Sequence, residues 1–541
     1  MYILGINGGV RMGYQDISAV LMKDGEVIAA IEEERLNRVK NSPNQLPERA
    51  IVEVLSIGGI TIQDIDIVAT HGSTWGDQYQ EVLTGYFKNT FGSVPTIQRY
   101  HHHDCHSASA FYAAGYAEAL VISIDGSGDG VCTQISIGNA DGLKLLHRFE
   151  RPNSLGLFYS LITQYCGFKK DSDEYKLMGL SSYGDASAYN FDWLLGLHDE
   201  GQYTLDTSYL VEIKPGQPQP SKQEMFFNQK LIDKLGTNRR KGEALDERFK
   251  NIGASAQRHL EKAIINIVKH YIAQTGIRKV CLAGGVALNC VVNQKLMDLP
   301  EVEALFIQPA SSDAGISLGA AMLASAAVGQ KPVATDNVYW GRGYSNQEIS
   351  RILDQLHAPY KRVAEPALVA AEAIHAGKVV GWVQGRDEFG PRALGNRSIL
   401  ADPTRADMQE LVNLKIKFRE SFRPFCPSVL EEDSTLYFEG AQAIAPYMTI
   451  TYNVKPTAAK QLPAITHVDG TARIQTVNTR QNPLYYQLLQ HLKRLNGHGV
   501  VLNTSFNRDS EPIVHSPVDA VSAFYGCGMD VLVIGDCVLR K

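Results

Sequence analysis

Two short segments of this sequence carry side chains suited to binding a phosphorylated ligand. Lys417-Phe-Arg419 places two cations one residue apart, and in an extended segment both would lie on the same side. About 85 residues further on, Ser505-Phe-Asn507 offers a hydroxyl and an amide at the same spacing. Cations match the charge of a phosphate, and the neutral groups can hydrogen-bond to a nucleotide. The pattern predicts a site for a phosphate and a nucleotide.

Further arginines lie close to these segments in the sequence, several of them next to glycines. A guanidinium cluster with glycines that let the backbone approach a ligand favours an anionic substrate over a solvated face. The whole chain has a net charge of -6, so the basic cluster is local and gives no support for general nucleic-acid binding. The segments are Gly385-Arg386, Gly390-Pro-Arg392, Gly395-Asn396-Arg397 and Arg423.

A run of histidines predicts a metal site. Residues 101–106 read His-His-His-Asp-Cys-His and precede a helix-forming stretch at residues 107–114. On a helix, His102 and His106 lie one turn apart, which directs both imidazoles at one ion. The alternative is a surface histidine run with incidental spacing.

Such a site also needs carboxylates. Asp125 and Asp313 both lie at strand or loop ends beside glycines, and Asp104 or Cys105 are alternative ligands. Two histidines with one or two aspartates suit a divalent metal such as Fe(II), and Mn or Zn also fit. A metal here would act as a Lewis acid beside the acceptor and as a template for phosphate, not as a redox centre.

The first third of the chain uses one pattern twice, which places these residues on an α/β framework. A short apolar strand leads into a glycine-rich turn and then a hairpin. The second copy has its glycine turn at residues 125–130, which includes Gly126 and Gly128. Repetition of this pattern is typical of the duplicated actin and sugar-kinase fold, in which the two turns approach ATP from opposite lobes. The expected strands are 3–6, 17–22 and 27–31, then 119–124, 131–137 and 143–149.

A helix is expected at residues 254–275, followed by a strand at 279–283 that opens onto Gly284-Gly285-Val-Ala-Leu-Asn289. A glycine turn between a strand and a helix suits nucleotide binding through backbone N–H groups, and a tight packing turn is the alternative. A second small-residue helix is expected at 316–327. We place the domain boundary near residue 345, which gives domains 1–345 and 346–541, the latter with a strand at 379–383.

Composition indicates a globular protein. The 541 residues are 44% apolar and 20% charged, and at that length two to four domains are expected. No uninterrupted apolar run reaches the roughly 18 residues of a membrane span, and residues 1–10 are typical of a strand rather than a signal peptide. The eight cysteines form no CxxC pair, which indicates reduced thiols in a cytoplasmic protein and no structural zinc.

Taken together, these motifs resemble those of the O-carbamoyltransferases of the NodU and TobZ kind. Those enzymes modify nodulation factors, aminoglycosides, cephems and other natural products, antibiotics among them. The resemblance extends over nearly the whole chain and is carried by several motifs in order. They are Glu32-Glu-Glu-Arg35-Leu-Asn-Arg38-Val-Lys40, His102-His-Asp-Cys-His106, Tyr175-Lys-Leu-Met-Gly179, Gly284-Gly-Val-Ala-Leu-Asn289, Phe389-Gly-Pro-Arg-Ala-Leu-Gly-Asn-Arg397, His467-Val-Asp-Gly-Thr-Ala-Arg473 and Leu502-Asn-Thr-Ser-Phe-Asn507.

The resemblance implies two active sites. The second domain would be YrdC-like, with the Lys417/Arg419 and Ser505/Asn507 pairs as its KxR and SxN signature, and would form carbamoyl adenylate from carbamoyl phosphate and ATP. The kinase-like first domain would pass the carbamoyl group to an acceptor hydroxyl beside the metal. The family implies the following roles: iron ligands His102, His106, Asp125 and Asp313; adenylate contacts Lys40, Gly285 and Asn289; carbamoyl phosphate contacts Arg386, Lys417, Arg419 and Arg423; and ATP contacts Arg392, Asn396, Arg473 and Asn503.

The sequence departs from the family at the expected general base. Family members usually carry His-Asp before the first hairpin, and this chain has Gln15-Asp16. Glutamine cannot take a proton near neutral pH, although it can orient a hydroxyl or a water. Asp16, a metal-bound water or the substrate would then supply the base. Alternatively, the acceptor is an amine or a phenol-like group, or this position only shapes the acceptor pocket.

Two other functions fit parts of the sequence. One is a protein-directed carbamoyltransferase of the HypF kind, but the acylphosphatase domain and CxxC zinc modules of that machinery are missing from the sequence. The other is a nucleotide-binding regulatory ATPase that transfers nothing, which would not need the arginine cluster. The expected partners are carbamoyl phosphate and a small specialised metabolite, with no nucleic acid and no membrane. The sequence leaves the acceptor and the oligomeric state open, a homodimer included.

Overall fold

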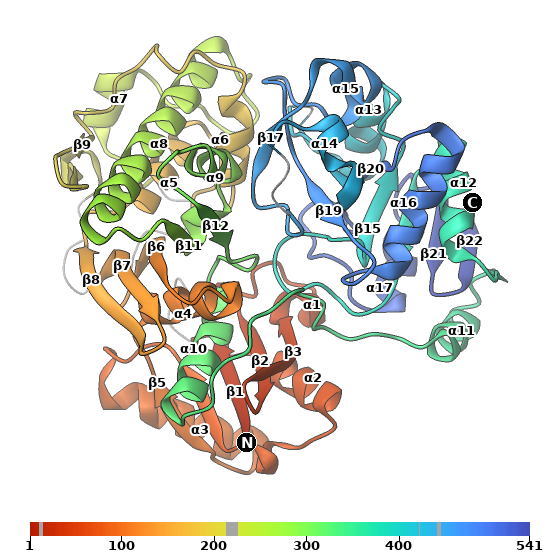
Figure 1. The fold of residues 1–541 in the computed structure, drawn as a ribbon, viewed down its shortest axis with the longest axis horizontal. Helices are drawn as coiled ribbons and strands as arrows, with labels where there is room; N and C mark the ends of the chain where they lie inside the picture. The colour runs from red at the N-terminus through yellow and green to blue at the C-terminus, as the bar shows by residue number, and fades with distance from the viewer. Residues whose placement is uncertain (10–14, 212–224, 421, 441–444) are drawn as a thin grey trace.

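The computed structural model describes residues 1–9, 15–211, 225–420, 422–440 and 445–541 (Figure 1). Its N-terminal part contains two five-stranded sheets with the same topology. In each, an antiparallel three-stranded meander is extended by two strands that run parallel to its first strand. The first sheet has the order β3-β2-β1-β4-β5, with β1 Tyr2–Asn7, β2 Ser18–Lys23, β3 Glu26–Glu32, β4 Ile67–Thr70 and β5 Thr96–Arg99. The second has the order β12-β11-β6-β7-β8, with β6 Ala119–Gly128, β7 Val131–Asn139, β8 Gly142–Glu150, β11 Lys279–Ala283 and β12 Ala304–Ile307.

This repetition confirms the predicted duplication and the α/β, actin and sugar-kinase-like fold class. All six strands expected from the repeated pattern are present, each within a few residues of its predicted ends. The second glycine turn is shorter than predicted, because β6 continues as far as Gly128 before the chain reverses. Residues 10–14, which precede Gln15, lie outside the described part of the chain.

Two helices fill the space between the sheets and carry residues of the predicted metal site. Helix α4 (His102–Ala114) packs on the second sheet, and α10 (Ala314–Ala327) packs on the first (Figure 1). The two helices also pack on each other, and a Cβ added at Gly319 of α10 would lie 1.7 Å from the carbonyl oxygen of Cys105. Only glycine permits this close approach, so the small-residue composition of α10 sets the distance between the two halves.

The outer faces of both sheets are covered by helices. On the first sheet these are α2 (Glu48–Gly58) and α3 (Gly76–Phe91), whose apolar side chains enter the core beneath it. The second sheet is covered by α5 (Leu155–Tyr165), with α8 (Glu247–Thr275) and α6 (Glu174–Ser181) stacked outside it. Helix α8 begins two turns earlier than the helix predicted at 254–275, because Asp246 caps it by accepting from the N–H of Phe249. No described helix is both long and apolar enough to cross a bilayer.

The C-terminal part is built on one mixed eight-stranded sheet. Alternate residues of β21 (Val531–Ile534) face opposite sides, Val531 and Val533 toward α12 (Pro366–His375) and α16 (Pro483–Asn496), Leu532 and Ile534 toward α17 (Pro517–Tyr525). The sheet order is β13-β22-β21-β14-β15-β20-β16-β19. The other strands are β13 Lys361–Arg362, β14 Val380–Val383, β15 Arg397–Ala401, β16 Cys426–Leu430, β19 Gln475–Val477, β20 Val500–Ser505 and β22 Cys537–Arg540. The boundary near residue 345 and the YrdC-like character of this part stay predictions.

A seam of arginines joins the two parts. It begins at α1 (Glu33–Asn37), inside the Glu32–Lys40 motif, and its arginines donate to backbone carbonyl oxygens, while Arg35 and Arg38 also lie 3.6 Å from the carboxylates of Glu32 and Asp519. Glu32 adds one bond in the other direction by accepting from the N–H of Gly390 at 2.6 Å. The arginine bonds are Arg35 to Gly390 O at 2.6 Å, Arg38 to Ile513 O at 2.7 Å and Pro512 O at 2.9 Å, and Arg386 to Ile28 O at 2.8 Å.

Candidate functional site

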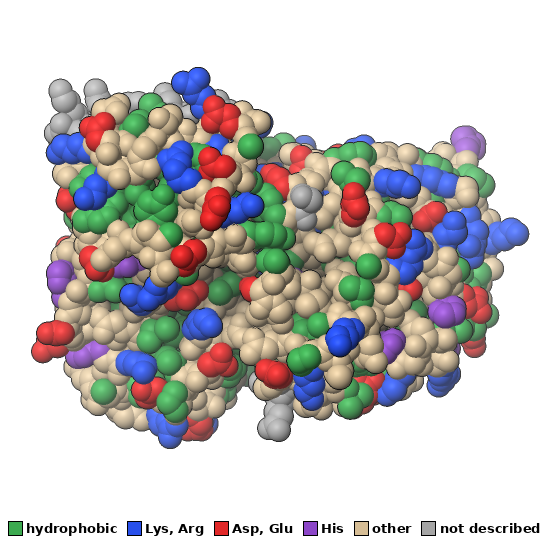
Figure 2. Space-filling model, turned by 90° about the horizontal axis from the view of Figure 1, so that it is seen from above, with side chains coloured by type: hydrophobic (Ala, Val, Ile, Leu, Met, Phe, Trp, Pro, Cys, Tyr) green, Lys and Arg blue, Asp and Glu red, His purple; other side chains and the backbone are tan. Residues whose placement is uncertain are grey.

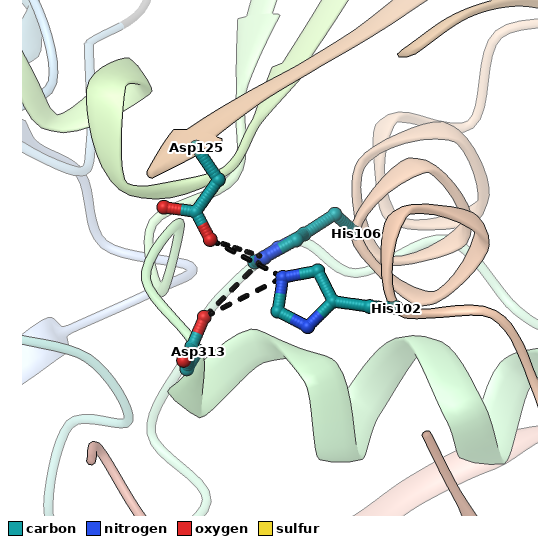
Figure 3. A group of neighbouring side chains, drawn as sticks. All are labelled: His102, His106, Asp125 and Asp313. Carbon is teal, nitrogen blue, oxygen red and sulfur yellow. Dashed lines mark hydrogen bonds and ion pairs between the residues drawn. The ribbon is translucent and has the colours of Figure 1, made fainter. Parts of the chain in front are cut away.

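The predicted metal ligands meet at one point between α4, β6 and α10 (Figure 3). One ligand atom from each of His102, His106, Asp125 and Asp313 can be chosen so that all four lie within 4.8 Å of one another. Asp125 Oδ2 lies 3.2 Å from His102 Nε2 and 3.5 Å from His106 Nε2, and Asp313 Oδ1 lies 3.8 and 3.6 Å from the same nitrogens. The i, i+4 spacing on α4 therefore directs both imidazoles at the two carboxylates.

The electrostatics of this cluster fit a bound cation. His106 is fully buried, and its Nε2 faces two carboxylates without a hydrogen bond of normal geometry among the described residues. Burial lowers the pKa of His106, but Asp125 and Asp313 outweigh it and raise the pKa to about 9. Burial raises the pKa of Asp125, yet His102 and His106 bring it well below its usual range. Two imidazoles with two carboxylates form a donor set for a divalent transition metal such as Fe(II), Mn or Zn.

Neighbouring groups hold His102 in place. Its backbone N–H donates to Asp129 Oδ2 at 2.8 Å, and a Cβ added at Gly128 would lie 2.1 Å from its imidazole ring. A Cβ added at Gly126 would meet no atom within 4 Å. Gly128 is therefore required by the packing of a metal ligand, whereas Gly126 only lines the cavity described below.

The other candidates in the histidine run have different partners. Both ring nitrogens of His103 are hydrogen-bonded, to Ser123 Oγ at 2.7 Å and to Val131 O at 3.0 Å. The carboxylate of Asp104 accepts from Gln134 and Arg148, and Cys105 is buried in the core beside α10. The structure therefore does not bring Asp104 or Cys105 into the cluster as alternative ligands.

A second group of side chains, here called the cation cluster, consists of Arg392, Lys417, Arg419, Arg423 and Arg473. These five residues line a single cavity. Burial and the charge of Arg423 lower the pKa of Arg419 to about 9, and burial and the charge of Arg473 lower the pKa of Arg392 to about 10. Among the described ion pairs, one carboxylate reaches the cluster, through Arg423. Cations held together with so little compensation favour the binding of a polyanion.

Lys417 and Arg419 do not lie on an extended segment, and that prediction is wrong. Lys417 ends a π-helical turn at Asn413–Lys417, and Phe418 follows with φ of 47° in the left-handed region. This turn buries Lys417 and leaves Phe418 61% exposed. The sequence gives no signal for a π-helix, and such turns occur preferentially at functional sites.

Lys417 connects the two predicted phosphate-binding segments. Its ammonium group donates to Asn507 Oδ1 at 2.7 Å, to Asn507 O at 3.1 Å and to Ser505 Oγ at 3.2 Å. Ser505 ends β20 and donates its hydroxyl proton to Asn507 Oδ1. Burial and the charges of Arg419 and Arg423 bring the pKa of Lys417 well below its usual range. The KxR and SxN segments are thus in direct contact.

The metal cluster and the cation cluster open into the same cavity, whose volume is about 1370 Å³. Most of the predicted site residues line it, and His106 lies directly behind its wall. The space-filling view shows positive and negative side chains interspersed over the face of the molecule that it draws (Figure 2). The predicted residues on the wall are Gln15, Asp16, Lys40, His102, Asp125, Gly126, Gly128, Gly285, Asn289, Asp313, Arg392, Lys417, Arg419, Arg423, Arg473, Asn503, Ser505 and Asn507.

Two predictions need correction, because neither residue is among those that line the cavity. Arg386 was expected to bind carbamoyl phosphate, but its guanidinium donates to the carbonyl oxygens of Gly341, Trp340 and Ile28. Asn396 was expected to contact ATP, but its amide donates to Arg386 O at 2.7 Å and accepts from Asn482 at 2.9 Å. Both residues therefore support the seam of arginines that joins the two parts of the chain.

The glycine turn after β11 serves packing as well as the cavity. Its Gly285 N–H donates to Asp125 Oδ1 at 3.3 Å, so the turn helps to orient a metal ligand. Asn289 caps α9 (Cys290–Met297) by accepting from Val292, and its amide also pairs with Gln257. The Asn503 amide nitrogen donates to Ala393 O and Ser428 Oγ, both in the second domain, whereas its buried Oδ1 accepts no hydrogen bond among the described residues.

Asp16 lies on the cavity wall near the metal cluster. Its backbone has φ of 55°, and Asn41 donates to its Oδ1 at 2.6 Å. Burial raises the pKa of Asp16 to about 6, and the charges of Asp313 and Glu34 add to the effect. A carboxylate with a pKa near 6 suits a general base at neutral pH. Gln15 also lines the cavity.

Sequence reasoning assigned no role to some residues of the wall. Tyr175 lies under Arg423, with the guanidinium carbon 4.7 Å from the ring centroid. Cys426 accepts from Arg473 Nη2 at 3.0 Å. Tyr175 stands in one of the quoted motifs, so the signal was present without an interpretation. Cys426 has no such signal, because its partner is about 47 residues away in the sequence.

Comparison with known proteins identifies the family to which the chain belongs. Residues 76–322 match the carbamoyltransferase N-terminus family and residues 371–541 match the carbamoyltransferase C-terminus family. Nodulation protein NolNO of Sinorhizobium fredii is 38% identical over 583 aligned residues, which cover 100% of this chain and 83% of that protein. The 3'-hydroxymethylcephem-O-carbamoyltransferase of Amycolatopsis lactamdurans is 34% identical over 47% of each chain. Full-length HypF in its phosphate- and nucleotide-bound form is 13% identical over 62% of this chain and 56% of its own, with a TM-score of 0.37.

These matches define a transferase. The chain belongs to the carbamoyltransferase family, among whose members are named O-carbamoyltransferases.

Proposed function

We propose that this enzyme forms carbamoyl adenylate from carbamoyl phosphate and ATP at the cation cluster and transfers the carbamoyl group to a hydroxyl of a small natural-product acceptor. The observation that carries the proposal is the single cavity shared by the cation cluster and the metal cluster. A water hydrolyses the donor to carbamate and phosphate, and a carbamate oxygen then attacks the α-phosphorus of ATP and displaces pyrophosphate, which leaves carbamoyl adenylate. Guanidinium groups neutralise the charge that develops on both leaving groups.

The residues of the second domain divide this work. Lys417, Arg419 and Arg423 would hold carbamoyl phosphate, while Arg392 and Arg473 would bind the phosphates of ATP. Asn503 would contact the nucleotide, and its buried Oδ1 accepts no hydrogen bond among the described residues. Lys417 binds Ser505 and Asn507 through hydrogen bonds that a phosphate would have to replace or share.

The first domain would carry out the transfer. The acceptor hydroxyl would lie near Asp16, whose raised pKa allows it to take the proton as the oxygen attacks the carbamoyl carbon, and AMP leaves. His102, His106, Asp125 and Asp313 would hold a divalent metal, Fe(II) on family grounds, and when bound it supplies Lewis acidity at the acceptor oxygen. Lys40, Gly285 and Asn289 would contact the adenylate. A chamber within the protein would limit hydrolysis of this intermediate.

Carbamoyl phosphate-dependent exchange of labelled pyrophosphate into ATP, measured without any acceptor, tests the first half-reaction. The wild-type protein is expected to show exchange, and Lys417→Ala or Arg419→Ala is expected to abolish it. Persistence of exchange in both variants would contradict the assignment of the cation cluster. Mass spectrometry of candidate natural products incubated with enzyme, ATP and carbamoyl phosphate would detect the carbamoyl mass gain of the second half-reaction.

A further inference from the structure

One acidic side chain of the second domain, Glu420, lies directly behind the cation cluster. Its Oε2 is 3.6 Å from Arg423 Nη1, and its Oε1 is 3.2 Å from the ammonium group of Lys176. Neither Glu420 nor Lys176 lines the cavity, whereas Arg423 does. Among the described ion pairs Glu420 is the one carboxylate that reaches a member of the cation cluster, so it supports that cluster from outside the ligand space.

Lys176 belongs to the first domain, at the start of α6, which makes this an interaction between domains. Asp173, the residue just before α6, holds the Lys176 ammonium from the other side at 3.3 Å. Tyr175, which precedes Lys176 in the sequence, lines the cavity, and Arg423 lies over its ring. Arg423 therefore has a first-domain ring beneath it and a carboxylate, itself held by a first-domain lysine, at its edge.

The charges agree with this geometry. Burial raises the pKa of Glu420, but a hydrogen bond from its own backbone N–H, together with Lys176 and Arg423, outweighs it and lowers the pKa below its ordinary value. Burial lowers the pKa of Lys176, and Tyr175, Asp173 and Glu420 outweigh it in the opposite direction. Both groups are thus stabilised in their charged forms at neutral pH. A pair that is charged and only partly exposed restricts the orientation of the arginine it contacts.

We propose that Glu420 is a positioning residue: held by Lys176 of α6, its carboxylate orients Arg423 toward the phosphate of the donor, so that donor binding depends on the docking of α6 against the second domain. The inference deepens the proposed function and rests on it. It also assigns a purpose to the Tyr175-Lys176 motif, in which Tyr175 supports the guanidinium face and Lys176 fixes its acidic partner.

The sign of the effect separates this role from plain electrostatics. Glu420→Gln removes a negative charge next to arginines, and that change alone would strengthen the binding of an anion and lower KM. If orientation of Arg423 dominates, KM for carbamoyl phosphate in pyrophosphate exchange rises instead, by about five- to tenfold, the size of one well-placed charged hydrogen bond. The kcat of exchange is expected to change less than about twofold, because Arg423 would contribute to binding rather than to chemistry.

Three further variants complete the experiment. Lys176→Met is expected to raise KM as Glu420→Gln does, and the double variant to be no worse than either single one, since both act through one contact. The charge swap Lys176→Glu with Glu420→Lys restores attraction between the domains but places a lysine against Arg423. It should therefore recover the melting temperature and not KM. Glu53→Gln, which weakens the contact of Glu53 with His515 of the second domain at 3.9 Å and its pair with Arg342 at 3.2 Å, is the matched control with an unchanged KM.

The failure of this inference can be distinguished from that of the proposed function. If Arg419→Ala abolishes exchange while Glu420→Gln and Lys176→Met keep or lower the wild-type KM, the proposed function stands and the positioning role is wrong. Recovery of KM by the charge swap would also overturn it, because the pair would then only join the domains. If the wild-type protein shows no exchange, calorimetry with pyrophosphate decides: the same five- to tenfold weakening in Glu420→Gln supports the positioning of Arg423, and unchanged or tighter binding refutes it.

Discussion

Arg392→Gln is expected to stabilise the protein without ligand while it weakens binding of phosphorylated substrate. Burial and the neighbouring charge of Arg473 lower the pKa of Arg392 from its ordinary value to about 10. That change corresponds to roughly 3 kcal/mol of unfavourable free energy for the charged form in the folded protein. For a base with a lowered pKa, this cost is fully present below about pH 10 and disappears above the pKa of arginine in the unfolded chain. At pH 7 the folded protein therefore carries all of it.

The measurable gain in the free energy of unfolding of Arg392→Gln is smaller than this cost. Arg392 is only partly buried by its neighbours, and water in the cavity screens its charge. We expect about 1–2 kcal/mol, or a rise of about 2 °C in the melting temperature of the unliganded protein. Thermal unfolding with and without pyrophosphate is the assay, and the ligand-induced rise in melting temperature should be smaller in Arg392→Gln than in the wild type. Arg392→Lys retains the charge and should not be stabilised, and Arg494→Gln, at an exposed position of α16, should leave both values unchanged. A lower melting temperature in Arg392→Gln with an undiminished pyrophosphate effect would refute the reasoning.

Three other outcomes are expected. Gly128→Ala should abolish stoichiometric metal binding, measured by elemental analysis, because the added Cβ would lie 2.1 Å from the His102 ring. Gly126→Ala, whose Cβ meets no atom within 4 Å, should retain the metal. Equal metal retention in both variants would contradict the packing argument. His106→Ala should lose metal and carbamoyl transfer while it keeps pyrophosphate exchange, and loss of exchange instead would mean that the two half-reactions are assigned to the wrong domains. Asp16→Asn should reduce transfer by about a hundredfold or more and remove the fall in rate below about pH 6 that protonation of Asp16 imposes on the wild type, with exchange unaffected. A pH profile for transfer that keeps its acid limb in Asp16→Asn would exclude this residue as the base.

Local patterns predicted the parts of the fold that local forces decide. The two hairpins follow from short turns between apolar strands, and the helical spacing of His102 and His106 directed both rings at one point as expected. Asp125 and Asp313 could be chosen because each follows a strand or a loop beside glycines. These predictions depend on neighbours within a few residues, so the sequence alone contains the needed information.

Long-range contacts account for the predictions that the structure does not bear out. Arg386 has the same flanking glycine as an anion-binding arginine, but carbonyl oxygens more than 40 residues away satisfy its guanidinium. The π-helical turn before Phe418 is compatible with no simple periodicity and is fixed by the burial of Lys417 against Ser505 and Asn507. No property of an isolated segment distinguishes these cases from their alternatives.

The carbonyl-directed bonds of Arg35, Arg38 and Arg386 have a consequence for protein engineering. Main-chain oxygen atoms survive any substitution of the residue that carries them, so the opposing surface can drift in identity without losing these three anchors. Chimeras that graft the amino-terminal half of one relative onto the carboxyl-terminal half of another should therefore assemble with this junction intact, and new acceptor preferences could be recombined with an unaltered activation machinery.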